Sequence, residues 1–480
     1  MRLIDYKSRK GGRGSAALWM VAGTAVLLAG CAEYKASPIV AAETAAVLET
    51  RSLDDQRLAR FIEAARPGAR AGDWNLSNLT LAALYFHPDI ELSRAKLAVA
   101  EASVQTAKQR PNPLLSLLPS FNQTVSTPSP WTIGAVVSLL VDATGQRDAR
   151  IAQSESMVEA ARHDLTTASW QVRGQVRSAL LALWAAQGRQ DLVNKRADLQ
   201  EEFVGVLERR FIVGEATSLD VSRERINLNQ LRLAAAEAGR QAEEARAKLA
   251  SAIGVPLKAL ANIEPRLVEI EMPAAQVRIA SITAPDLRRT ALESRSDVLA
   301  LLAEYEAAQG ALRLEIAKQF SNLTLGPGYT YDQGDHKYSF EIGGELPIFN
   351  RNQGPIAEMT ARRQEAAARF TALQAQIIAA IDTALTNHRA SMRMAELASS
   401  QLASQTGRRR QLQRGVQLGE LDRSTVMSAD IEIGVAELAR YEAGVQQRQA
   451  LEMLEDALQQ PLFETAAGIP LLARIVGSRE

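Results

Sequence analysis

The chain has 480 residues and equal numbers of basic and acidic side chains, so its formal net charge is zero. That balance gives no indication of a nucleic-acid surface. Aromatic residues make up only 5% of the chain, whereas Ala, Leu, Gln, Glu and Arg are abundant, and this composition favours long helices.

The amino terminus has the pattern of a secretion signal. Basic residues come first, and an apolar stretch from Ala16 to Leu28 follows that is too short to span a bilayer. The stretch ends in Leu28-Ala29-Gly30-Cys31. This ending resembles a bacterial lipobox, in which the cysteine becomes the lipidated first residue of the mature protein.

Cys31 is the only cysteine of the chain, so no internal disulfide can form. Ala32 follows it rather than an aspartate, which by resemblance to Gram-negative lipoproteins favours the outer membrane. The alternative is a chance cysteine beside an ordinary cleavage site. No later stretch resembles a transmembrane helix, so any passage through a membrane would use strands.

The first part of the mature chain predicts a linker and a helix. Residues 32–72 are expected to be a linker with one short helix, Asp54 to Ala65. A helical run with an apolar stripe extends from Trp74 to about Arg110, where Pro111-Asn112-Pro113 stops it.

Two stretches alternate between apolar and polar residues, as the strands of a hairpin do. The clearer one, Leu323 to Leu346, turns at Asp332-Gln333-Gly334-Asp335. In its second arm four apolar residues share one face and four polar residues share the other: Tyr338, Phe340, Ile342 and Leu346, against Lys337, Ser339, Glu341 and Glu345. A weaker hairpin runs from Leu115 to Asp142.

Each hairpin is followed by a very long helix and then by a shorter one. The run from Gln146 to about Val213 contains no proline and would form a helix of roughly 100 Å. Gly214 breaks it before a helix from about Asp220 to Ile253. A connection, 255–284, and a helix from Pro285 to Phe320 lead to the second hairpin. The remaining helices are expected at 355–418 and 424–459, with Gly419 as the break between them.

The two halves share residue types as well as layout, at an offset of roughly 205 positions. Ile151-Ala152 corresponds to Ile356-Ala357, and Gly214-Glu215 to Gly419-Glu420. The predicted division is a signal peptide at 1–30, a lipidated linker at 31–73, a first repeat at 74–270, a second repeat at 271–465 and a tail at 466–480.

The predicted fold class is mainly α with a membrane β-barrel. Four amphipathic strands per chain cannot close a barrel, because membrane barrels start at about eight strands and an open edge would leave backbone groups unsatisfied in lipid. Several copies would therefore build one barrel, and their long helices would continue it as a periplasmic tube. A small β-flap on a helical protein is the simpler alternative.

Several motifs resemble TolC-type outer-membrane efflux proteins. The resemblance covers about residues 74–465 and is closest to the CzcC branch. It rests on the two repeat openings, the helix–turn–helix tip and the segments around the second hairpin: Asn78-Leu79-Thr80-Leu81-Ala82-Ala83-Leu84 with His87-Pro88-Asp89-Ile90, Ala291 to Val298, Arg210 to Val221, Thr144 to Arg147, Leu314 to Tyr329 and Leu346 to Pro355.

The resemblance implies a homotrimer with a twelve-stranded barrel in the outer membrane and a long α-barrel in the periplasm. Its partners would be a periplasmic adaptor protein and an inner-membrane pump of the resistance-nodulation-division (RND) type, in a Gram-negative bacterium. The CzcC branch is associated with the export of divalent metal cations.

Two groups of candidate site residues follow. The tip, as the resemblance implies, would contact the adaptor through Arg210, Gly214, Thr217, Leu219, Asp220, Val221, Gly419 and Glu420. Thr425 stands where Asp220 stands in the first tip, so the two tips are not expected to bind alike. Candidate residues facing the lumen are Ser339, Glu341, Glu345 and Asp142. There the two glutamates are expected to be ordinary solvated carboxylates of the wall, with attraction of cations as the alternative.

The residues do not predict an enzyme. The four histidines, His87, His163, His336 and His388, have no ligand spacing, so neither a metal centre nor a cofactor is expected. Two alternatives to a metal efflux channel remain: a drug-efflux or type I secretion channel of the same fold, and a periplasmic coiled-coil lipoprotein that forms no channel.

Overall fold

A computed structural model describes residues 34–68, 72–124, 129–267 and 283–462. The chain forms two compact units, Met1–Thr50 and Arg51–Glu480. In the first unit the described residues contain helix α2 (Ala41–Glu49), with no buried residue. The linker was predicted to contain a single helix, so α2 is a correction. Ala-rich stretches without a hydrophobic stripe give a weak sequence pattern.

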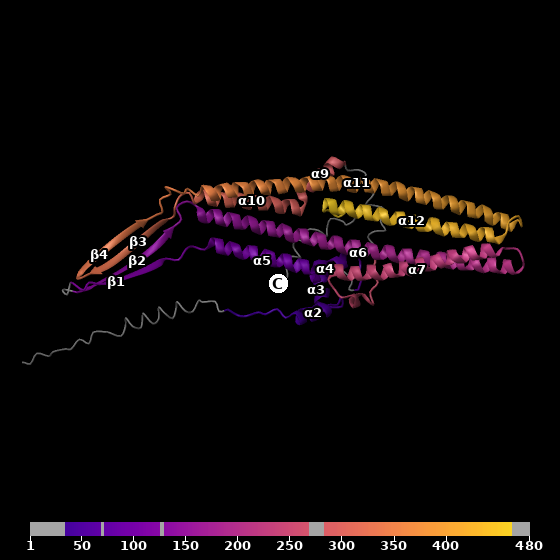
Figure 1. Cartoon of the computed structure of the whole chain (residues 1–480), viewed down its shortest axis with the longest axis horizontal. Coiled ribbons are helices and arrows are strands. Elements are labelled where there is room, and N and C mark those ends of the chain that lie inside the picture. Colours follow the sequence, from indigo (N-terminus) through magenta and orange to yellow (C-terminus); the bar gives the residue numbers. More distant parts are fainter. Residues whose placement is uncertain (1–33, 69–71, 125–128, 268–282, 463–480) are drawn as a thin grey trace, which may run out of the picture. The chain divides into compact units, whose positions relative to one another are not determined.

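The second unit contains two similar halves (Figure 1). The first half consists of α3 (Gln56–Ala65), α4 (Leu76–Phe86), α5 (Pro88–Lys108), β1 (Leu114–Phe121), β2 (Trp131–Val141), α6 (Gln146–Ile212), α7 (Ser218–Ile253) and the short 3-10 helix η1 (Leu257–Leu260). The second half consists of α9 (Ala284–Ser294), α10 (Ser296–Ala317), β3 (Leu323–Asp332), β4 (Asp335–Gly343), α11 (Gln353–Gln417) and α12 (Arg423–Leu458).

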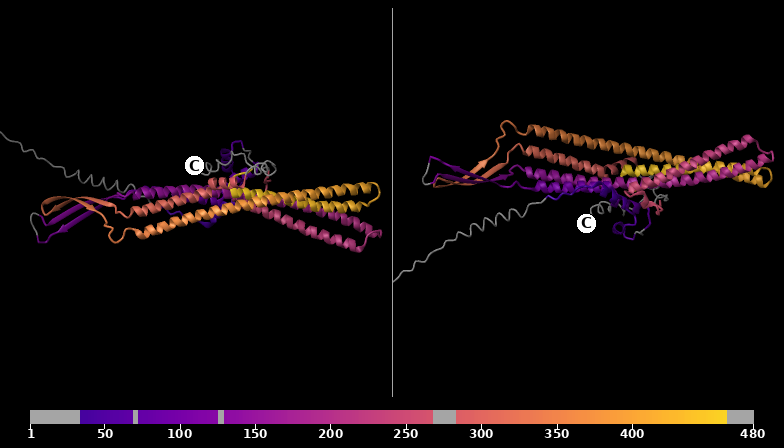
Figure 2. Two further views of the ribbon diagram at one scale, coloured as in Figure 1. Left: turned by 90° about the horizontal axis from the view of Figure 1, so that it is seen from above. Right: turned by 60° about the horizontal axis from the view of Figure 1, so that its bottom comes forward.

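The long helices set the dimensions of this unit. Helices α6 and α11 contain 67 and 65 residues, which corresponds to roughly 100 Å each. In each half a pair of shorter helices packs along the long one, α5 and α7 on α6, and α10 and α12 on α11. Within the unit, the strands lie at one end of the helices and the turns α6–α7 and α11–α12 at the other, as Figure 2 also shows.

Two helical runs that were predicted to be continuous are each divided. The run from Trp74 becomes α4 and α5, which meet at His87 and Pro88, and the run from Pro285 becomes α9 and α10, which meet at Arg295. His87 and Arg295 both have extended backbone conformations. A proline forces the residue before it out of the helical region, and this explains the first break.

The two hairpins form one antiparallel sheet in the order β1-β2-β3-β4. The central pairing joins the halves, with Ala135 opposite Tyr329 and Leu139 opposite Leu325. Strand β4 ends at Gly343, so the prediction that the second arm extends to Glu345 and Leu346 was wrong, and these two residues lie beyond the strand. Strands β1 and β4 have no partner on their outer sides among the described residues.

Two separate apolar cores hold the helices together where the halves are thickest. The first joins the helices of the first half through residues such as Leu79, Leu84 and Leu249. The second joins α9, α11 and α12 through residues such as Ile381 and Leu454. Neither core extends to the strands or to the turns at the far end, so those regions lack a core of their own.

Candidate functional site

The first candidate site is the four-stranded sheet, whose two faces differ in chemistry. Because opposite residues in an antiparallel sheet point to the same side, the register defines each face. We call one the apolar face: Leu115, Leu117, Pro119, Phe121, Trp131, Ile133, Ala135, Val137, Leu139, Val141, Leu323, Leu325, Pro327, Tyr329, Tyr331, His336, Tyr338, Phe340 and Ile342. The predicted alternation is therefore confirmed within the strands.

The opposite face, called here the polar face, combines small, hydroxyl and charged residues with a few aliphatic ones. Thr132 donates a hydrogen bond to Asp332 over 2.7 Å, and Lys337 pairs with the same carboxylate. This network crosses three strands. Sequence reasoning missed it, because Thr132 and Asp332 are 200 positions apart.

Aromatic rings gather on the apolar face near the loop end of the hairpins. Phe121 and Trp131 meet edge to face at 5.0 Å between ring centroids, and Tyr329 and Tyr338 lie 5.5 Å apart. All four rings are apolar or amphipathic, and the apolar face on which they lie is exposed. Rings in such a band are typical of the level where a membrane meets water.

The four candidate lumen residues do not form one group. Ser339 and Glu341 belong to the polar face, opposite Gly328 and Gly326. Asp142 follows the last residue of β2 and accepts hydrogen bonds from the backbone N–H of Thr144, Gln146 and Arg147, so it closes the junction before α6.

Glu345 lies beyond β4, where its backbone carbonyl accepts a hydrogen bond from the Ser321 hydroxyl over 2.7 Å. It therefore belongs to the connection between sheet and helix rather than to a strand. A role in the lumen stays a prediction for all four residues.

The second candidate site is the turn between α6 and α7, which we call the first tip. Gly214 has a φ of 83°, which favours glycine. Thr217 and Asp220 form a capping box: the N–H of Asp220 donates to the Thr217 hydroxyl, and the N–H of Thr217 donates to the Asp220 carboxylate. Thr217 and Asp220 therefore stabilise the turn itself, whatever else they contact.

The turn between α11 and α12, the second tip, is built differently. Gly419 has the matching φ of 77°. Here Asp422 caps α12, because its side chain accepts from the N–H of Ser424. The described second tip has no capping box, since Thr425 stands in the place of Asp220 and has no carboxylate. The two tips thus differ in their local structure, and that they bind a partner differently stays a prediction.

A polar contact joins the two tips. The guanidinium of Arg210, at the end of α6, pairs with Asp422 and donates to the Ser424 hydroxyl over 3.0 Å. The same guanidinium lies 3.6 Å from Glu215. Arg210 was expected to contact a partner protein, and its described contacts are with Glu215 of its own tip and with Asp422 and Ser424 of the other tip.

Apolar side chains are exposed around both glycines. Ile212 and Val213 are 81% and 68% exposed and Leu219 is 67% exposed, whereas Val221 is buried. Leu418 beside Gly419 is 73% exposed. Ile212, Val213 and Leu418 were not among the predicted site residues, although apolar residues in a turn are unusual enough to have indicated them.

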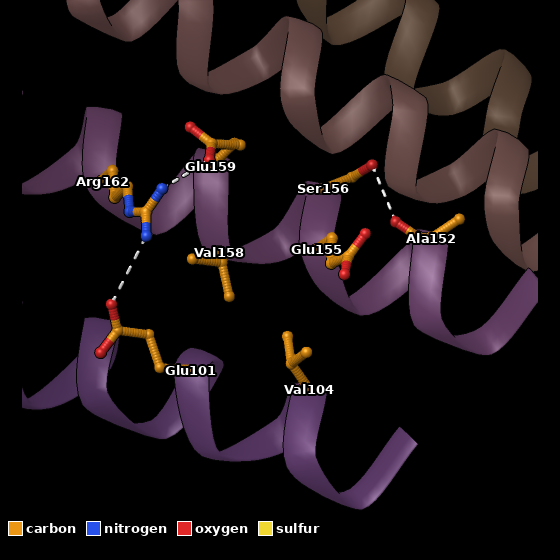
Figure 3. A pocket seen from close by; sticks show the side chains of 8 residues that line it. All are labelled: Glu101, Val104, Ala152, Glu155, Ser156, Val158, Glu159 and Arg162. Carbon is orange, nitrogen blue, oxygen red and sulfur yellow. Dashed lines mark hydrogen bonds and ion pairs between the residues drawn. The ribbon is translucent and has the colours of Figure 1, made fainter. Parts of the chain in front are cut away.

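A groove with a volume of about 590 Å³ lies between α5 and α6 (Figure 3). Its acidic residues already have cationic partners: Arg162 lies 2.7 Å from Glu159 and 3.7 Å from Glu101, and Lys108 lies 3.7 Å from Glu155. The part of the chain that the structure describes contains no group of three or more His, Cys, Asp or Glu suited to a metal ion.

Two further predictions concern the membrane. Cys31, the expected lipidation site, lies outside the described residues. Over residues 34–68, 72–124, 129–267 and 283–462, none of the helices combines the length and hydrophobicity needed to cross a bilayer.

The chain is similar to known proteins in sequence. Residues 80–255 match the family model described as "Outer membrane efflux protein". The cobalt-zinc-cadmium resistance protein CzcC of Cupriavidus metallidurans is 27% identical over 270 residues, 56% of this chain and 62% of the relative. The pyoverdine export outer membrane protein OpmQ of Pseudomonas aeruginosa is 26% identical over 298 residues, 60% of each chain. The similarity thus spans about three fifths of each relative.

Solved structures share the fold. The outer-membrane channel OprN has a TM-score of 0.67 at 18% identity and covers 90% of this chain and 99% of its own. The outer membrane protein VceC of Vibrio cholerae has a TM-score of 0.65 at 19% identity, covering 81% and 97%. CusC has a TM-score of 0.64 at 16% identity, covering 83% and 96%.

These similarities confirm the predicted resemblance and the predicted fold class. They also agree with the prediction that the chain is not an enzyme, since the family and the similar structures are described as outer-membrane proteins and channels.

Proposed function

Because the chain belongs, through residues 80–255, to the outer membrane efflux protein family, we propose that it is the outer-membrane channel of a tripartite RND-type efflux system. It would act as a passive duct from the periplasm to the outside. The observation that carries the proposal is the sheet: four strands, one continuous apolar face and two open edges.

The open edges call for further copies of the same chain. In lipid an unpaired strand edge leaves N–H and C=O groups without hydrogen bonds, at a cost of several kcal/mol per group. Pairing β4 of one copy with β1 of the next removes both edges. Three copies of four strands give a closed barrel of twelve, with the apolar face toward lipid and the polar face toward the lumen.

We propose that the two tips are the contact with a periplasmic adaptor protein, and through it with the inner-membrane pump. Both tips present exposed apolar side chains, including Ile212, Leu219 and Leu418, at the end of the unit away from the sheet (Figure 1). Exposed apolar clusters on a polar helical surface are suited to protein–protein contacts.

For the cargo we propose divalent heavy-metal cations, by similarity to CzcC, a cobalt-zinc-cadmium resistance protein. Export of pyoverdine or of a drug by the same fold is the second candidate, because OpmQ, a pyoverdine export protein, is 26% identical. We also propose that Cys31 carries lipid and anchors the chain in the outer membrane, as its lipobox-like setting indicates.

Single-channel conductance of the purified protein in planar bilayers, together with its mass in detergent, tests the duct. We expect a trimer and discrete conductance steps. A monomer without conductance would contradict the proposal and favour a lipid-anchored helical spacer.

Cargo needs a separate test. In a strain that lacks the protein, we expect greater sensitivity to cobalt, zinc and cadmium, reversed by the wild-type chain. Unchanged metal sensitivity with an intact channel would reject the metal cargo but not the channel, and pyoverdine export would be measured next.

A further inference from the structure

Charged side chains lie deep in the contact between α6 and α12. Arg173 and Arg177, one helical turn apart on α6, are 4% and 3% exposed. Both pair with Glu455 of α12, which is fully buried; Arg173 Nη1 lies 2.7 Å from its Oε1. Glu452, one turn earlier on α12, is 7% exposed. We call these four residues, with Asp456 at their rim, the charge cluster.

The charge cluster is not balanced when every member is ionised. It holds two guanidinium groups and three carboxyl groups. Both guanidiniums pair with Glu455, and Arg173 also lies over the ring of Trp170, 4.9 Å from its centroid. The Oε1 atom of Glu452 is buried and makes no hydrogen bond with any described residue. Glu452 is therefore a second deeply buried carboxyl group beside Glu455, the one with which both guanidiniums pair.

Burial makes this charge costly. Burial raises the pKa of Glu452 to about 7, and the neighbouring Asp456 and Glu455 charges act in the same direction against the attraction of Arg177 and Arg173. A proton on Glu452 makes the cluster neutral and removes its repulsion from the other carboxylates.

Several other charged groups near this level have their own partners, whereas burial and the charge of Glu455 raise the pKa of Asp456. Arg295, at the α9–α10 junction, pairs with Asp297 and donates to the carbonyl of Ala457. On α11, Asp382 pairs with Arg288. His388 on α11 is buried, and burial with the nearby charge of Arg389 lowers its pKa below 6.5.

We propose that Glu452 is a proton-operated clamp on the crossing of α6 and α12, one of the contacts that join the first half of the molecule to the second. With Glu452 protonated, the charge cluster is neutral and holds the crossing. With Glu452 ionised, an extra buried negative charge weakens it. Because α6 and α12 also lead to the two tips, the clamp contributes to how firmly the two helical pairs are held together.

The direction of the pH dependence follows from linkage. The pKa of Glu452 is raised from 4.5 in the unfolded chain to about 7 in the folded one, so the folded state binds the extra proton between these values. The stabilisation is complete below pH 4.5 and is lost as the pH rises to about 7.

Thermal unfolding of the full-length protein in detergent, measured from about pH 5 to about pH 8, tests the clamp. We expect the Tm of the wild type to fall by several degrees over this range. Glu452→Gln keeps the size of the side chain without its charge, so it should remove this decrease and raise the Tm at the alkaline end. Glu437→Gln, which breaks an exposed pair with Lys195 on the same helix, is the matched control and should keep the wild-type decrease.

The infrared C=O band of protonated carboxyl groups gives a second readout in protein with isotope-labelled glutamate. In the wild type, part of the band should titrate with a midpoint of about 7, and this part should be absent from Glu452→Gln. A wild-type Tm that does not change with pH, a Glu452→Gln variant that keeps the decrease, or a band without this component would each overturn the proposal. Since neither measurement needs a conducting channel, the result is independent of the proposed function.

Discussion

Gly310 carries a hydrogen atom in place of a side chain, and this allows α10 to approach α6 closely. A Cβ atom at this position of α10 would lie 3.0 Å from the Cα of Gln153 on α6. Because the obstacle is backbone rather than the end of a flexible side chain, it cannot turn away. We therefore predict that Gly310→Ala lowers the free energy of unfolding by about 1–3 kcal/mol, measured by thermal or denaturant unfolding in detergent.

Gly407 provides the control for this substitution. It also lies in a helix, α11, but a Cβ atom there would meet nothing within 4 Å. Gly407→Ala should raise stability by up to about 1 kcal/mol through helix propensity alone. Equal effects of the two substitutions would mean that the α6–α10 contact does not depend on the missing side chain.

The corresponding helix ends of the two halves differ at residue scale. Gly254 ends α7 with a φ of 82°, and a Cβ atom there would lie 3.0 Å from the carbonyl oxygen of Phe86. Gln459 ends α12 at the related position with a φ of 48°, and its side chain accepts hydrogen bonds from Ser296. The repeated sequence pattern predicted that a helix ends at both places. It did not predict the contacts that stabilise each helix end, because those contacts come from residues far away in the sequence.

At the scale of elements, the contact between Arg210 and Asp422 joins the helix pair α6–α7 to the pair α11–α12. Asp422→Asn should keep the helix cap, because Asn caps as well as Asp, but remove the charge that faces Arg210. We expect little change in global stability, since an exposed pair contributes up to about 1 kcal/mol. Spin labels at Leu219 and Leu418, both exposed, should report a broader distance distribution between the tips.

Two further variants separate the roles of Asp422. Asp422→Ala should add the loss of the cap, about 1 kcal/mol. Glu208→Gln breaks an exposed pair with Arg225 inside one helix pair and should leave the distance between the tips unchanged. A distribution that Asp422→Asn does not alter would indicate that apolar packing alone holds the tips together.

The sequence predicted those features of the elements that depend on nearby residues, and it did not predict contacts between residues far apart in the chain. The long helices, their breaks at Gly214 and Gly419, and the alternation of the strands are local patterns, and the structure contains them. The pairing of β2 with β3 is not local, since Ala135 and Tyr329 lie far apart in the chain. The sequence pattern therefore could not distinguish two separate hairpins from one four-stranded sheet.

The charge cluster could not be predicted for a related reason. Arg173 and Arg177 are one turn apart, and Glu452 and Glu455 are close to one turn apart. On a long helix such spacing is typical of a solvated face. Only the crossing of α6 with α12 buries both sets of charges against each other.

At the scale of the whole molecule, the second unit combines two kinds of surface. Its helices carry many charged and polar side chains, whereas its sheet has an exposed apolar face that the described part of the chain leaves uncovered. An exposed apolar area of this kind needs either lipid or protein over it. The neighbouring residues Phe340 and Ser339 lie on opposite faces of β4. Substitutions at these two positions therefore test separately what covers each face of the sheet.

We predict that Phe340→Arg prevents stable insertion while Ser339→Arg is tolerated. Phe340 is 63% exposed on the apolar face, where an arginine in lipid costs about 2–4 kcal/mol near the middle of the bilayer. At Ser339 the same side chain would point to the polar face and remain in water. The measurement is the amount of each variant in the outer-membrane fraction and its migration as an oligomer before and after heating. Equal loss of both variants would argue against a lipid-facing sheet, and equal tolerance would indicate that the apolar face is covered by protein instead.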